Sequence, residues 1–224
     1  MKQINLRLYD IDELSETAQE KALDKYRTYN VDDFEWYEYE LEDFKNLCAI
    51  VGIDIPENGI SFNGFWSQGD GSTFASVIDT AQFINGIKGQ AWKEYAPLLD
   101  FHFPACPCTE RVLRLIRKNY IQCRLRTEKP KRGYWVQYQS DYDCYRDRQD
   151  YPNIEKELQT LDKWIKRCLI ILNNYLYRTL EEQYSYETSD KVLLQTFRDS
   201  AQVFTADGKM ADRLLKIATN SITQ

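Results

Sequence analysis

Apolar and polar residues alternate or recur at regular spacings along the chain, and these patterns predict its secondary structure. Strict alternation over residues 3–9 predicts a half-buried strand. Ser15 precedes a run whose apolar residues share one helical face, so we expect its hydroxyl to cap a helix. Apolar residues spaced by three and four predict a second helix, which begins near Asp32 or Asp33 and ends at Gly52.

The middle of the chain mixes strand and helix signals. Residues 60–66 and 73–78 are rich in β-forming residues, which predicts two paired strands. Residues 80–99 have a helical pattern that two glycines interrupt. Two prolines deny backbone donors to residues 100–108, so we expect an irregular segment there.

A basic helix and a hairpin are predicted next. Thr109 is expected to cap the helix, which runs to Asn119. Residues 120–127 and 133–142 then read as two strands joined by a turn. Residues 143–153 are predicted to form a polar loop.

The longest helix is predicted from Ile154 to about Glu182. Its apolar stripe alternates spacings of four and three and consists of Leu158, Leu161, Ile165, Cys168, Leu172 and Tyr175. Such a stripe fits packing across a sheet within one chain, which we favour, or a coiled-coil seam with a second chain. Thr188 or Ser189 is then expected to cap another helix, and a last short helix covers roughly residues 209–219.

These elements predict an α+β fold. Strands pair locally around helices, without repeated strand–helix–strand units, so we expect a largely antiparallel sheet of about five strands. No internal repeat or flexible linker is visible, and residues 1–224 are expected to form a single α+β domain. A separate helical C-terminal lobe over residues 154–224 is the alternative.

Composition limits the function classes. The 224 residues are 43% hydrophobic and 14% aromatic, which is typical of a globular protein. A net charge of −6 argues against a general nucleic-acid-binding protein, which needs excess cations to displace phosphate counterions. No apolar run approaches the ~20 residues that span a bilayer, and the N-terminal segment lacks the apolar centre of a signal peptide. We therefore expect a cytoplasmic protein without a membrane partner.

Charge is unevenly distributed along the chain. Acids dominate residues 10–43 and bases dominate residues 111–132, which fits two solvated faces, or an acidic face for a basic partner and a basic strip for an anion. The candidate anion-binding residues are Arg124, Arg126, Lys131 and Arg132. Neighbouring aromatic residues also resemble a single-strand platform, but a hairpin with a charged exposed face explains the pattern as well.

Metal binding and conventional catalysis have little support. The six cysteines are expected to be free thiols in a cytosolic chain of this length. His102, Cys106 and Cys108 lie close in sequence but lack a usual zinc spacing, so no metal or other cofactor is expected. Two catalytic arrangements remain open. One is a Cys106 nucleophile activated by His102, and the other is a hydrolase in which Asp70 acts with a distant acid. We name no catalytic residue, and an enzyme is the less favoured class.

The most unusual stretch is residues 61–74, where two glycines flank Asp70 and allow positive φ angles. Polar groups beside aromatic faces commonly hold ligands or peptides. The candidate ligand- or partner-binding residues are Phe65, Trp66, Ser67, Gln68, Asp70 and Ser72. The alternative is a tight hairpin loop in which Asp70 and Gln68 satisfy the chain's own amides.

Residues 62–71 read Phe-Asn-Gly-Phe-Trp-Ser-Gln-Gly-Asp-Gly. This segment resembles a motif in an uncharacterised family of small proteins of tailed phages and prophages, some labelled antitoxin-like. The resemblance covers roughly residues 1–75 and 180–224, including Tyr184–Asp190 and Phe204–Gly208, but not the middle of the chain. It implies a mobile-element accessory protein that acts inside a bacterial cell.

The sequence therefore predicts a non-enzymatic phage or prophage accessory protein. We expect it to bind a host protein and thereby inhibit a bacterial defence system or a toxin. The alternative is a small-molecule binding protein or hydrolase, with Trp66, Gln68 and Asp70 lining a site for a nucleotide-like ligand. A third reading is a regulator that binds nucleic acid through residues 111–135, and the oligomeric state stays open.

Overall fold

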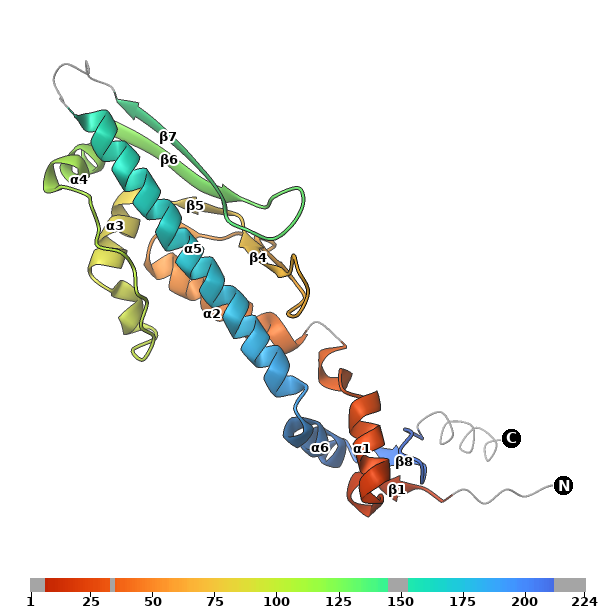
Figure 1. The fold of residues 1–224 in the computed structure, drawn as a ribbon. Coiled ribbons are helices and arrows are strands. Elements are labelled where there is room, and N and C mark those ends of the chain that lie inside the picture. The colour runs from red at the N-terminus through yellow and green to blue at the C-terminus, as the bar shows by residue number, and fades with distance from the viewer. Residues whose placement is uncertain (1–6, 33–34, 145–152, 212–224) are drawn as a thin grey trace, which may run out of the picture. The chain divides into compact units, whose positions relative to one another are not determined.

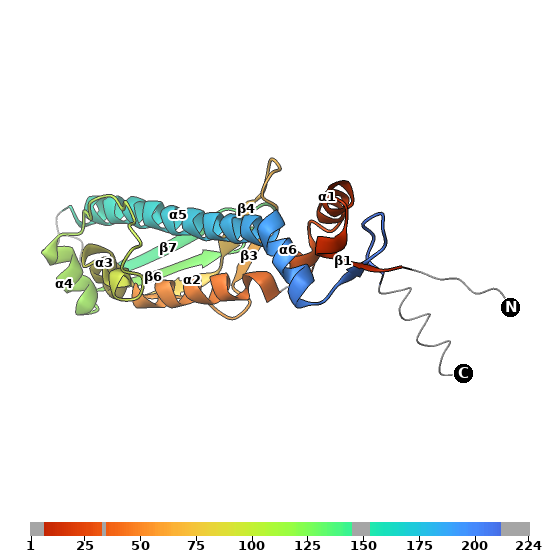
Figure 2. The ribbon, with the colours of Figure 1, turned by 90° about the horizontal axis from the view of Figure 1, so that it is seen from below.

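The computed structural model describes residues 7–32, 35–144 and 153–211 (Figures 1 and 2). Helices combine with antiparallel sheets, which confirms the predicted α+β fold. The chain divides into two compact units: Met1–Tyr37 with Glu182–Gln224, and the continuous segment Glu38–Glu181. The boundary near Glu182 falls inside a long helix and not at residue 154, and the single-domain interpretation stays a prediction.

The larger unit contains a four-stranded antiparallel sheet with the order β2-β5-β6-β7. These strands are β2 (Ile53–Asp54), β5 (Ser76–Ile78), β6 (Ile121–Glu128) and β7 (Gln137–Cys144). A separate two-stranded hairpin pairs β3 (Ile60–Asn63) with β4 (Gly71–Phe74). The strand predicted over residues 73–78 therefore serves two sheets, because the chain changes partners at Ala75.

Helices cover the inner face of this sheet. They are α2 (Glu38–Ile50), α3 (Thr80–Lys88), α4 (Glu110–Arg117) and the part of α5 (Ile154–Glu187) that belongs to this unit, with a 3-10 turn η4 (Ala91–Glu94) after α3. Along β6, Ile121 and Leu125 are buried while Arg124 and Arg126 are exposed, so opposite faces of the strand meet core and solvent. Figure 1 shows α5 running along the sheet.

The apolar stripe of α5 is buried within its own chain, as we favoured over a coiled-coil seam. Leu161, Ile165 and Leu172 are no more than 1% exposed. Trp164, Leu169 and Leu176 are also buried, so the apolar face is wider than a spacing of four and three requires. A helix with so broad a buried face packs against several neighbours, as a sheet-covering helix does.

The smaller unit brings both ends of the chain together. β1 (Tyr9–Asp10) pairs with β8 (Val203–Phe204) in an antiparallel register, and α1 (Glu16–Lys25) and α6 (Asp190–Asp199) supply its helices. Three 3-10 turns complete it: η1 (Ile11–Glu13), η2 (Tyr29–Val31) and η3 (Glu35–Tyr37). Its core consists of Ile11, Ala22, Leu23, Leu193, Phe197 and Phe204.

Local signals placed several helix starts correctly. The side chains of Ser15, Thr109 and Ser189 each accept a backbone N–H at the start of a helix. The second helix begins later than predicted, at Glu38, after η3; Asp33 lies outside the described residues. Most of the strand predicted over residues 3–9 and of the helix over 209–219 also lies outside them.

Among the described residues, no helix combines the length and apolar character that crossing a bilayer requires.

Candidate functional site

The loop that joins β3 to β4 is shaped by one carboxylate. Asn63 pairs with Gly71, and the residues between them form the loop. The Asp70 carboxylate accepts the backbone N–H of Trp66 at 2.9 Å and that of Ser67. Because these are the loop's own amides, Asp70 is used to hold the loop and not to hold a ligand.

Two glycines make this conformation accessible. Gly64 has φ +55°, and a Cβ atom there would lie 2.4 Å from the Asp70 carboxylate. Gly69 has φ +103°, a region that other residues rarely adopt. The Tyr177 hydroxyl on α5 donates to the Gly64 carbonyl at 3.3 Å. Burial, with the nearby charge of Asp70, raises the pKa of Tyr177, which keeps this hydroxyl protonated as a donor.

The base of the loop is attached to α5 by a buried polar pair. The Ser72 hydroxyl donates to the Asn173 backbone carbonyl at 3.0 Å and lies 3.2 Å from its side-chain oxygen. The Asn173 amide donates in return to the Ser72 carbonyl at 2.9 Å. Ser72 is 1% exposed, so this predicted site residue faces the interior and supports the loop.

The tip of the loop exposes an aromatic ring on a packed base. Trp66 is 72% exposed, and Ser67 and Gln68 are also exposed. Phe65 is buried, with its ring centroid 5.8 Å from that of Trp66 and 5.6 Å from that of Tyr177. Of the six candidate residues, the structure thus directs Trp66, Ser67 and Gln68 outward, while Phe65, Asp70 and Ser72 support them.

The predicted anion-binding residues do not form one cationic patch. Arg124 bonds to Asp141 on the neighbouring strand at 2.9 Å. Arg126 lies 3.0 Å from Glu128 and also donates to Gln139. Lys131 and Arg132 are exposed in the turn between β6 and β7. Since carboxylates on the same face neutralise both strand arginines, the charged-hairpin interpretation fits this face better.

The cysteines and the histidine are not arranged for metal chemistry. Among the described residues, no group of three or more His, Cys, Asp or Glu side chains could hold a metal ion, and all six cysteines are free. The His102 side chain is 91% exposed. Burial raises the pKa of Cys106, and that of Cys108 to about 12, which is the opposite of what a thiolate nucleophile needs.

A polar cleft between β7 and α5 was not predicted from the sequence. It has a volume of about 430 Å³ and includes Tyr142 and Asp162. The hydroxyls of Tyr138 and Tyr142 donate to the same Asp162 oxygen, at 2.9 and 3.3 Å. One sequence feature could have indicated a polar site here: Glu155, Gln159 and Asp162 are spaced by four and three, which places them on one face of the predicted helix.

The geometry defines an α+β protein with a surface hairpin that hydrogen bonds hold to α5 and that exposes a tryptophan at its tip. Residues 36–190 match the family described as Domain of unknown function (DUF8835), and the chain belongs to this family. No curated protein and no solved structure matches it. The matched segment contains the loop of residues 62–74. It also contains the middle of the chain, to which the resemblance to phage proteins does not extend.

Proposed function

We propose that this chain is a non-enzymatic accessory protein of a phage or prophage, which binds a host protein in the bacterial cytoplasm through the loop of residues 62–74. In this proposal, binding inhibits a defence system or a toxin. The observation that carries it is the presentation of Trp66: this residue is 72% exposed, although its backbone N–H is held by Asp70 and its ring lies against the buried Phe65.

The energetic argument concerns preorganisation. A partner that buries Trp66 gains a large apolar contact, and a single such residue can contribute 2 kcal/mol or more, roughly a 30-fold change in Kd. Because Asp70, Gly64 and the Ser72–Asn173 pair already fix the loop, little conformational entropy is lost on binding. The small-molecule alternative has less support, since the Asp70 carboxylate is occupied by backbone amides.

The test compares Trp66→Ala with Tyr39→Ala, which removes another exposed ring, 80% exposed, from α2. Each tagged protein is used to capture bacterial host proteins, and the affinity for the protein captured by the wild type is then measured. We expect Trp66→Ala to weaken binding roughly 30-fold while Tyr39→Ala does not. Equal affinity of a folded Trp66→Ala variant would refute the proposal.

A further inference from the structure

A second cavity lies where the segment that follows α3 meets the middle of α5. It has a volume of about 300 Å³, and every residue that lines it belongs to the described part of the chain. The lining residues come from the end of α3, from η4, from the irregular segment 101–106 and, on α5, from Trp164. A cavity of about 150 Å³ holds one benzene ring, so this cavity is large enough for two fused rings.

The walls of this cavity are aromatic and are held by hydrogen bonds. Trp92 is 2% and Trp164 4% exposed. The indole N–H of Trp92 donates to the Leu99 carbonyl at 3.1 Å, and that of Trp164 donates to the Pro104 carbonyl at 2.7 Å, which joins this segment to α5 (Figure 1). The ring centroids of Trp92 and Phe103 lie 5.2 Å apart in an edge-to-face arrangement. Because these rings are already packed and bonded, a ligand loses little free energy in ordering them.

One polar side chain of the cavity is available to a ligand. Gln90 lines the cavity and is exposed, and its φ of +54° is one that residues other than glycine rarely adopt. Among the described residues, the Gln90 side-chain amide has no hydrogen-bond partner. An amide offers an acceptor and donors on one edge, which matches the adjacent donor and acceptor on the edge of an adenine ring.

The cavity offers no free charge. Among its lining residues, all of them described, only Lys88 is charged, and Lys88 is paired with Glu110 at 3.3 Å. Burial raises the pKa of the Cys106 thiol, so this lining group is uncharged at neutral pH. Aromatic walls, an unused amide and the absence of an unpaired charge favour a neutral, flat ligand over an ion.

We propose that this cavity binds a neutral purine-type base, that is, a planar nitrogen heterocycle of two fused rings. The base contacts the aromatic walls, and its hydrogen-bonding edge meets the Gln90 amide. No residue of the 62–74 loop lines the cavity, so the proposal goes beyond the proposed function and does not depend on it.

The probe is adenine, titrated into the full chain by isothermal titration calorimetry. We expect a Kd of about 0.1 mM, which is within the range for a ligand of about ten non-hydrogen atoms. Gln90→Gly removes the amide and suits the left-handed backbone, and it should weaken binding at least about fivefold. Asn119→Gly removes an amide from another left-handed position, with φ +55°, that does not line the cavity, and it should leave the Kd unchanged.

Two measurements test whether adenine occupies this cavity. Ala105 lines it from an exposed position, so Ala105→Trp should fill the cavity and abolish binding, while Ala105→Ser should bind as the wild type does. Adenine at about ten times its Kd should slow the reaction of Cys106 with N-ethylmaleimide about tenfold, because about one site in eleven is then empty. Cys144, which does not line the cavity, should react at an unchanged rate.

Three results would overturn the proposal: no binding at about 2 mM adenine, equal weakening by Gln90→Gly and Asn119→Gly, or unchanged binding by a folded Ala105→Trp variant. Two further probes test the class of ligand. Benzoate, a flat anion, and indole, which lacks the acceptor, should each bind at least about fivefold more weakly than adenine. Tighter binding of benzoate would mean that Lys88 is free to hold an anion, and tighter binding of indole would mean that apolar contact alone decides; both contradict a purine-type base.

Discussion

At the scale of single residues, the buried Ser72–Asn173 pair is expected to contribute to stability. Asn173→Ala removes the amide that donates to the Ser72 carbonyl, while the Ser72 hydroxyl keeps its bond to the backbone carbonyl of residue 173. Water does not reach this site, since Ser72 is 1% and Asn173 7% exposed. We expect a loss of about 2–3 kcal/mol in the free energy of unfolding, measured by urea denaturation. Asn174→Ala, one position along on the exposed side of α5, should change it by less than about 0.5 kcal/mol.

A double-mutant cycle decides whether this loss belongs to the pair. If the contact between the Ser72 hydroxyl and the Asn173 side-chain oxygen is stabilising, the double variant should lose less than the sum of the single losses, by about 0.5 kcal/mol or more. Strict additivity would mean that the contact between the two side chains adds nothing, and that each acts through its own bond to the other residue's backbone carbonyl or through packing.

The sequence predicted the composition of the loop but not the direction of its side chains. Glycines beside an acid indicate a turn, and Asp70 does accept the chain's own amides, as the alternative interpretation held. Ser72 gave no such indication, because β4 is buried on both faces and therefore lacks the alternation that distinguishes inside from outside. Its partner Asn173 lies a hundred residues away, and no local pattern links the two.

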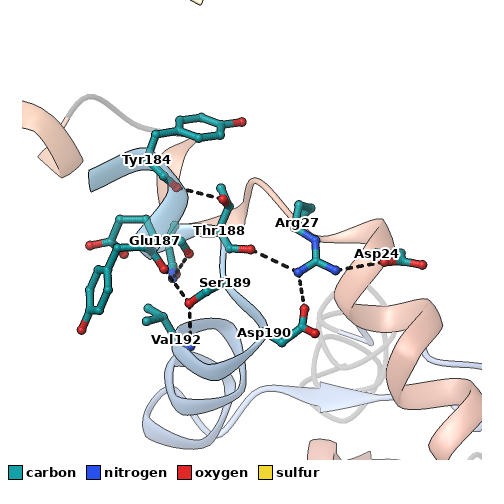
Figure 3. A network of polar contacts seen from close by, with 10 residues as sticks. Asp24, Arg27, Tyr184, Glu187, Thr188, Ser189, Asp190 and Val192 are labelled. Carbon is teal, nitrogen blue, oxygen red and sulfur yellow. Dashed lines mark hydrogen bonds and ion pairs between the residues drawn. The ribbon is translucent and has the colours of Figure 1, made fainter. Parts of the chain in front are cut away.

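At the scale of elements, the junction between α5 and α6 depends on side chains from the other end of the chain. The last carbonyl groups of a helix have no intrahelical partner. Here Asn30 donates to the Glu187 carbonyl at 3.1 Å. Arg27 donates to the Thr188 carbonyl at 3.1 Å (Figure 3). Arg27 also bonds to Asp190 and Asp24, so one guanidinium joins α1, the end of α5 and the start of α6.

We therefore expect Arg27→Met to loosen this junction while retaining the apolar stem of the side chain. The loss should be about 1 kcal/mol, because the guanidinium is partly exposed and its ion pairs are screened by solvent. Hydrogen exchange should accelerate in α6 and in the last turn of α5. Lys21→Met, an exposed change on α1, is the matched control; equal acceleration in both variants would show that the effect comes from lost charge alone.

Element boundaries were predictable where a local signal fixed them. Ser15, Thr109 and Ser189 identify helix starts because a cap bonds to an amide three residues away. The two local strand pairs were predicted and are found as β3–β4 and β6–β7. The pairing of β5 with β2 and with β6 was not predictable, because these strands are separated by long stretches of chain and pair through registers that sequence alone does not encode. The cleft beside β7 depends on how α5 packs against that strand, and no local pattern predicts this contact, which is why the cleft was missed.

At the scale of the whole molecule, the two compact units differ in how the chain builds them. The larger unit is one continuous segment, Glu38–Glu181, which contains the four-stranded sheet, the β3–β4 hairpin and helices α2 to α4. Its buried residues include Phe44, Phe74 and Phe83, all fully inside. The smaller unit takes strands and helices from both chain ends, Met1–Tyr37 and Glu182–Gln224. These two segments are joined covalently only through the larger unit that lies between them in sequence.

This difference predicts how the chain responds to cutting. A fragment of residues 38–181 keeps its own sheet, core and covering helix, and its length is typical of an independent domain, so we expect cooperative urea unfolding and a near-ultraviolet circular dichroism spectrum of fixed aromatic rings. The two terminal segments, mixed as separate peptides, should not fold at micromolar concentration, because association then costs several kcal/mol that the intact chain avoids. A fragment 38–181 that binds hydrophobic dye and unfolds without cooperativity would mean that the larger unit needs the chain ends, and that the two units fold as one domain.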